Sequence, residues 1–149
     1  MLFLAHWLNP FYFRKPLITF DLGTVVGDVA WAPYSSTVFA AVTVDGKVHV
    51  YDLHMNKYKA ACVQAIVPRR KAKLNHISFN LTSPIIIVGD SKGHIHCLKL
   101  SPNLRQQSKD VRMAILNKDL RAAGELEVGK LRKLLAQVKE AEEDTDNDK

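Results

Sequence analysis

The sequence predicts an all-β fold made of two similar units of short strands, followed by a C-terminal α-helix. Three observations support this prediction. Two stretches of the chain resemble each other at a spacing of nearly 50 residues. Each stretch carries turn residues between short apolar runs, and apolar residues recur at helical spacing near the C-terminal end.

The internal repeat consists of three matching segments in each unit. Trp31 aligns with Phe79 at an offset of 48 residues and Gly46 aligns with Gly93 at an offset of 47, so the units differ by one loop deletion. This spacing is typical of β-propeller blades. The matching segments are 29–33, 38–42 and 45–53 in the first unit, and 76–80, 85–88 and 92–100 in the second.

Turn and strand signals order each unit. Asp45-Gly46 predicts a tight hairpin, because glycine tolerates the positive φ of such a turn. After it, Val48 and Val50 should point to one face of a strand and His49 and Tyr51 to the other. The runs 38–42 and 85–88 are apolar throughout, which predicts strands buried on both faces. Residues 60–67 should form the outermost strand of the first unit.

Residues 25–53 resemble a WD repeat. An apolar-x-Trp-x-Pro element, an apolar second strand and an Asp-Gly-x-Val-x-Val-aromatic-Asp ending follow one another in that family's order. Tyr51-Asp52 stands where the family usually has Trp-Asp, and the second unit departs further, with Leu98-Lys99 there. The resemblance implies a partial WD-repeat β-propeller of about two blades. It also implies these structural WD-repeat positions: Trp31, Asp45, Gly46, Tyr51, Asp52, Phe79 and Gly93.

Longer strings resemble a particular group of WD-repeat proteins. Residues 26–37, 84–90 and 93–105 are similar to the closing repeats of dynein intermediate chains, most of all those of the axonemal outer arm, and the likeness covers roughly residues 17–140. It implies a non-catalytic scaffold that binds dynein heavy chains beside other intermediate and light chains. Such a chain would associate with microtubules through its complex, in the cytoplasm, cytoskeleton and axoneme of cilia and flagella, and would support their motility.

A propeller closes its ring with several blades, and this sequence supplies about two. We therefore expect a truncated form or fragment with an exposed sheet edge. Residues 17–22 would be the outer strand of a preceding blade, and the second unit should end at Leu100 without a fourth strand. The two blades would occupy residues 17–100.

The two ends of the chain differ from this β region. Residues 1–16 are predicted to be an irregular apolar segment without the features of a targeting signal. Residues 101–124 suit a linker and residues 144–149 a disordered acidic tail. Residues 125–143 predict an amphipathic helix that either docks on the propeller or binds a partner. Its apolar face comprises Val128, Leu131, Leu134, Leu135 and Val138.

Composition and charge leave few catalytic options. The chain has 149 residues, of which 47% are hydrophobic, and a net charge of +6, as expected of a basic globular protein. Cys62 and Cys97 fit no metal spacing and favour a reducing compartment. No cofactor motif occurs. The mainly apolar residues 1–8 are too few to cross a membrane, so no membrane partner is expected.

Several residues could carry chemistry in another context. His94 and His96 would share a strand face and could bind a metal, but a third ligand is missing in sequence, so ordinary strand positions are favoured. Asp28, Asp45 and Asp90 lie beside predicted turns, which favours structural roles over acid–base catalysis.

Two alternative functions remain. One is a generic WD-repeat scaffold of a cytoplasmic dynein or transport complex. The other, which the sequence favours less, is nucleic-acid binding through the basic cluster 69–73.

Overall fold

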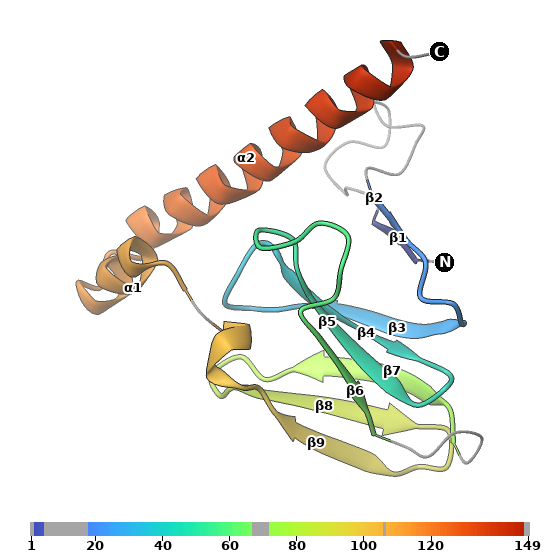
Figure 1. Cartoon of the computed structure of the whole chain (residues 1–149). Helices are drawn as coiled ribbons and strands as arrows, with labels where there is room; N and C mark the ends of the chain where they lie inside the picture. The colour runs from blue at the N-terminus through green and yellow to red at the C-terminus, as the bar shows by residue number, and fades with distance from the viewer. Residues whose placement is uncertain (1, 5–17, 67–71, 106, 148–149) are drawn as a thin grey trace.

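The computed structural model describes residues 2–4, 18–66, 72–105 and 107–147, with the side chains after residue 138 left aside. Its strands form two larger antiparallel sheets and one two-stranded sheet, and two α-helices follow (Figure 1). The predicted class, strands in two units followed by a C-terminal helix, is confirmed. The described strands do not close into a ring.

The first sheet has four strands in the order β3-β4-β5-β6. They are β3 (Val26–Trp31), β4 (Val38–Thr43), β5 (Lys47–Asp52) and β6 (Cys62–Ala65). The strand predicted over residues 60–67 is therefore confirmed as the outermost one, although Val67 lies outside the described residues. All six residues of β4 are buried, as its continuous apolar run predicts.

The second sheet has three strands in the order β7-β8-β9. They are β7 (Leu74–Phe79), β8 (Ile85–Asp90) and β9 (Ile95–Lys99). Among the described residues after Leu100, no fourth strand joins this sheet, as expected. The prediction that residues 85–88 are buried on both faces is wrong, because Ile87 keeps 42% of its surface exposed. In the part of the chain that the structure describes, one face of this sheet packs against another sheet and the face that carries Ile87 does not.

The two larger sheets pack face to face around one apolar core. Val38, Ala40, Val42, Val48 and Val50 of the first sheet belong to this core. Residues of the second sheet complete it, namely Leu74, Ile77, Ile86 and Val88, with Leu100 just after β9. The alternation predicted for β5 is confirmed, since Val48 and Val50 point into this core whereas Tyr51 belongs to a separate cluster on the opposite face.

The N-terminal strands form a small sheet of their own. β1 (Leu2–Leu4) pairs antiparallel with β2 (Ile18–Phe20). The prediction of an irregular segment over residues 1–16 is therefore wrong at 2–4, because β2 offers a free edge on which a short apolar segment can pair. The residues 5–17 lie outside the described part of the chain.

Helices follow the second sheet. A 3₁₀ helix, η1 (Pro102–Arg105), leads to α1 (Lys109–Leu116), and α2 (Leu120–Asn147) comes next. The linker predicted over 101–124 is therefore mostly helical. The helix predicted over 125–143 begins five residues earlier, and it continues through Asn147 into the segment predicted to be disordered. No helix in the described ranges is both long and apolar enough to cross a membrane.

Candidate protein-interaction surfaces

The predicted WD-repeat positions of the first unit begin at the hairpin between β4 and β5. Gly46 has a φ of 86°, the left-handed conformation that the turn prediction requires. Asp45 accepts a hydrogen bond from the Thr43 hydroxyl and pairs with the Lys47 ammonium at 2.6 Å. Burial would raise the pKa of Asp45, but the contacts with Lys47 and Thr43 outweigh it and hold the pKa below its ordinary value. These contacts stabilise a turn and leave no free catalytic acid.

Three further predicted positions lie on the strands of the first sheet. The Tyr51 ring stacks on Phe39 with centroids 4.9 Å apart, and Trp31 lies 5.4 Å from the same ring. Asp52 accepts hydrogen bonds from the Thr37 hydroxyl at 3.2 Å and from the His54 backbone N–H at 3.0 Å. Trp31 and Tyr51 thus share one face, while Asp52 holds the end of β5. Their role as WD-repeat positions stays a prediction.

The second unit repeats this plan with different side chains. Phe79 packs at the edge of the core between the sheets, 6.3 Å from the Tyr34 ring. Gly93 forms the hairpin between β8 and β9 with a φ of 84°. Gly89, four residues before Gly93, lies within β8.

Asp90 organises the β8–β9 hairpin. Its buried carboxylate lies 3.0 Å from His94 Nδ1 and 3.3 Å from His96 Nε2. Burial would raise the pKa of Asp90, but hydrogen bonds from the backbone N–H groups of His94 and Lys92 and from both imidazoles lower it far below its ordinary value. The two histidines therefore share a carboxylate, a contact that their sequence spacing did not reveal. In the described ranges, no group of three or more potential ligands is arranged to hold a metal ion.

Asp28 connects the two sheets. It lies within β3 and not beside a turn, which corrects the sequence-based placement. Its carboxylate accepts a hydrogen bond from the Ile77 backbone N–H at 3.0 Å and lies 2.8 Å from His76 Nδ1. The neighbouring Gly27 has no room for a side chain, since a Cβ there would lie 2.1 Å from the Leu74 carbonyl oxygen. Sequence reasoning missed this contact because it joins residues about 49 positions apart.

The helix α2 docks on the face of the first sheet that points away from the second sheet (Figure 1). Leu134 is buried there in a cluster with Phe20, Phe39, Tyr51 and Leu53, and Leu131 packs against the same cluster. This observation supports the docked interpretation of the helix. Of the other predicted apolar positions, Val138 is buried, Leu135 is partly buried and Val128 is 47% exposed.

Polar contacts hold the N-terminal half of α2. Glu127 accepts hydrogen bonds from the Ser36 backbone N–H at 2.9 Å and from the Ser36 hydroxyl at 2.7 Å. Lys130 donates to the Ser35 hydroxyl at 3.0 Å. These partners lie in the turn between β3 and β4, so the helix is fixed to the sheet at both a polar and an apolar site.

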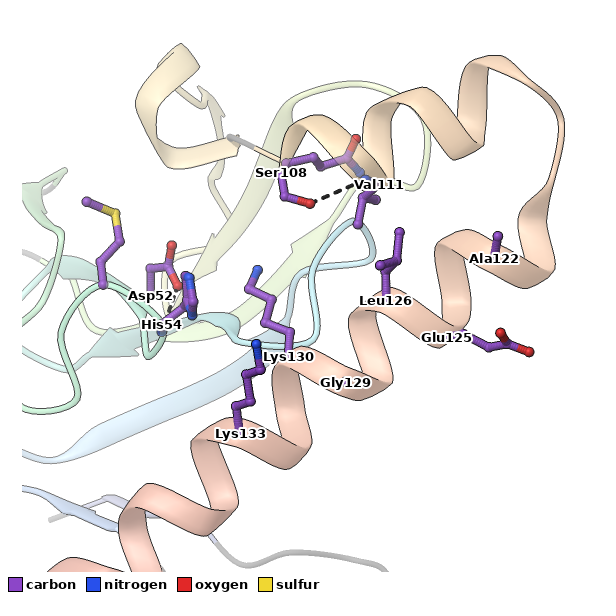
Figure 2. Close-up of a pocket in the computed structure, with 12 residues that line it drawn as sticks. Asp52, His54, Ser108, Val111, Ala122, Glu125, Leu126, Gly129, Lys130 and Lys133 are labelled. Atoms are coloured by element: carbon purple, nitrogen blue, oxygen red, sulfur yellow. Dashed lines mark hydrogen bonds between the residues drawn. The ribbon is translucent and has the colours of Figure 1, made fainter.

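A groove of about 720 Å³ runs between the loop after β5 and the two helices. Figure 2 shows the side chains of Lys130 and Lys133 extending from α2 toward Asp52 and His54, while Glu125 points away. Leu126 and Gly129 belong to the α2 side of this groove. An open groove of mixed polarity suits contact with protein better than enclosure of a small substrate.

Exposed apolar side chains gather on the helical end of the chain. Met113, Leu116 and Leu120 keep 57%, 70% and 74% of their surfaces exposed. Met113 and Leu116 lie three residues apart on α1 and so share a helix face. The basic cluster 69–73, by contrast, falls largely outside the described residues, so its proposed nucleic-acid contact stays untested.

Comparison with known proteins shows which chains this sequence is similar to. The chain is 57% identical over 133 residues to "Dynein intermediate chain 2, ciliary" of Heliocidaris crassispina, covering 89% of this chain and 18% of the relative. It is 52% identical over 132 residues to "Dynein axonemal intermediate chain 1" of Bos taurus, with the same coverage of both. The chain is a homologue of the dynein intermediate chains. The matched part is a fragment of their C-terminal region.

Other comparisons define the extent of this similarity. The flagellar outer-arm dynein 78 kDa intermediate chain of Chlamydomonas reinhardtii is 52% identical over 96 residues, which cover 64% of this chain and 14% of the relative. The chain thus spans less than a fifth of the length of the curated relatives that it matches. No protein-family model matches it.

Proposed function

We propose that this chain is a non-catalytic WD-repeat scaffold segment of an outer-arm dynein, located in the axoneme of cilia and flagella. The observation that carries the proposal is the identity of 52–57% to ciliary, flagellar and axonemal intermediate chains. In this role the chain binds dynein heavy chains, together with other intermediate and light chains, and supports motility. Microtubule contact is made through the complex.

The geometry supports a binding role. Asp28, Asp45 and Asp90 all use their carboxylates in contacts that hold strands and turns together. The surfaces that remain available are the groove beside α2 and the exposed apolar side chains of α1. Surfaces of this kind recognise other proteins.

The alternative scaffold, part of a cytoplasmic dynein, has weaker support. The cytoplasmic dynein 1 intermediate chain of Drosophila melanogaster is 32% identical over 97 residues, against 57% over 133 residues for the ciliary chain of Heliocidaris crassispina. The chain is therefore more similar to the ciliary chain than to the cytoplasmic one.

Affinity purification of the tagged chain from ciliated cells tests the proposal. We expect axonemal dynein heavy chains to be recovered with it, and we expect a Gly124→Ala control, which alters only open space on α2, to recover as much. A Gly27→Asp variant, which forces the two sheets apart, should recover none. Recovery of cytoplasmic heavy chains alone, or equal recovery by the Gly27→Asp variant, would contradict the proposal.

A further inference from the structure

Two Ser-Pro dipeptides lie at one end of the second sheet. Ser83-Pro84 directly precedes β8, and Ser101-Pro102 follows β9 after one residue. The two dipeptides are neighbours in space, because the Leu100 backbone N–H donates to the Pro84 carbonyl oxygen at 2.8 Å. Both serines are exposed in the described part of the chain. A serine followed by proline is the dipeptide that proline-directed protein kinases phosphorylate.

The backbone around each serine makes the two dipeptides unequal substrates. Ser83 has both main-chain groups bonded, its N–H to the Asn80 side chain and its carbonyl to the Ile85 N–H, each at 2.7 Å. The residues after it form β8, which lies between β7 and β9. A kinase binds the residues around its acceptor in an extended conformation, so presentation of Ser83 requires the loss of a central strand.

The segment after Ser101 is held by far fewer contacts. It forms η1, in which the Leu104 backbone N–H donates to the Ser101 carbonyl oxygen at 3.0 Å. The Tyr34 hydroxyl donates to the Leu104 carbonyl oxygen at 2.8 Å. Pro102 and Asn103 are exposed. Opening of this single short turn extends the segment while both large sheets stay intact, so Ser101 is the better acceptor.

A positively charged pocket begins beside Ser101. Its volume is about 460 Å³, and it is lined by Pro102, Arg105, Gln107 and Arg112. Among the described residues, no carboxylate lines this pocket. Arg105 belongs to η1 and Arg112 to α1, so the two guanidinium groups come from separate helices. Because a guanidinium group donates two parallel hydrogen bonds to phosphate oxygens, this pocket suits a phosphate group.

We propose that Ser101 is a phosphorylation site for a proline-directed kinase, and that Arg105 and Arg112 bind its phosphate. The kinase transfers the γ-phosphoryl group of ATP to the Ser101 oxygen, and ADP and the hydroxyl proton are released. Ser101 then no longer donates to the Asn103 side chain, so the new group can turn toward the arginines. A charge of about −1.5 to −2 joins η1 to α1 and fixes α1 at the end of the second sheet. This inference does not depend on the proposed function.

Phosphorylation of the purified full chain by a mitogen-activated protein kinase with ATP tests the acceptor. Mass spectrometry of peptides measures the phosphate on each serine over time. We expect Ser101 to be phosphorylated about tenfold faster than Ser83, or more, because η1 opens more easily than β8. Ser101→Ala should remove this reaction, whereas the matched control Ser83→Ala should leave it unchanged. Phosphate mainly on Ser83, or none on Ser101, would overturn the proposal.

A second measurement tests the two arginines. Amide hydrogen exchange in α1 should slow about tenfold when Ser101 is phosphorylated, because the phosphate ties this helix to η1. The double variant Arg105→Gln and Arg112→Gln should be phosphorylated equally but lose the slowing. Arg121→Gln, an exposed position on α2 outside the pocket, is the matched control that keeps it. A phosphatase should also remove the phosphate faster from the double variant. Unchanged exchange in α1, or slowing that survives in the double variant, contradicts the assignment of the arginines.

Discussion

Substitution of Gly27 by alanine tests the contact between the two sheets. A Cβ at this position would lie 2.1 Å from the Leu74 carbonyl oxygen and 3.0 Å from the carbonyl carbon, and both belong to backbone that cannot rotate away. Strands β3 and β7 must separate by about 1 Å to relieve this overlap, and overpacking of this kind costs about 1–3 kcal/mol. The same movement stretches the bonds of Asp28 to Ile77 and His76, which adds about 1 kcal/mol or more.

We therefore expect Gly27→Ala to lower the free energy of unfolding by about 2–4 kcal/mol, a large part of the stability of a small domain. Urea unfolding followed by tryptophan fluorescence measures this change. With a urea slope of about 2 kcal/mol/M, the midpoint should fall by about 1–2 M at an unchanged slope. A midpoint within about 0.2 M of the unsubstituted chain would show that the sheets do not meet as described, and the reasoning would fail.

Four other substitutions test separate parts of the structure. Asp28→Ala leaves the Ile77 N–H without its acceptor and should cost about 1.5–3 kcal/mol in the same urea assay. Asp90→Asn should make the free energy of unfolding less sensitive to acid. The folded pKa of Asp90 is lowered, so its stabilisation is present above the ordinary carboxyl pKa of about 3.9 and is lost as pH falls below it. The urea midpoints of the variant and of the unsubstituted chain should therefore converge at low pH. Gly124→Ala meets open space within a helix and should raise stability by about 0.5–1 kcal/mol. Ser36→Ala removes the hydroxyl bonds to Glu127 and should speed amide exchange in α2 while leaving β4 protected.

The β region was predictable because its signals are local. Apolar runs separated by turn residues located strands β3 to β9, and the glycines at the two hairpins carry the positive φ that their positions require. The internal repeat supplied the order of the strands. The register between the two sheets was not predictable, since Asp28 and Ile77 meet across 49 residues and no local pattern encodes that pairing.

The first helix was missed although a local signal existed. The hydroxyl of Ser108 accepts a hydrogen bond from the Val111 backbone N–H, the contact of an N-cap, and Asp110 lies in the first turn. The polar run before Val111 concealed this signal because it also suits a linker. Val111 and Ala114 of α1 then pack on Ala123 of α2, a small core that extends the second helix toward its N-terminus.

The position of α2 shows why amphipathic spacing specifies a face and leaves its partner open. Leu131, Leu134 and Val138 recur at helical spacing, so they define an apolar stripe that must be covered by some surface. Within the described part of this chain, that surface is the face of the first sheet that points away from the second sheet, where Phe39 and Tyr51 pack against Leu134. Two apolar surfaces that lack other partners bury each other, and the gain of roughly 1.5–3 kcal/mol per large side chain is the same whichever sheet or helix supplies the area.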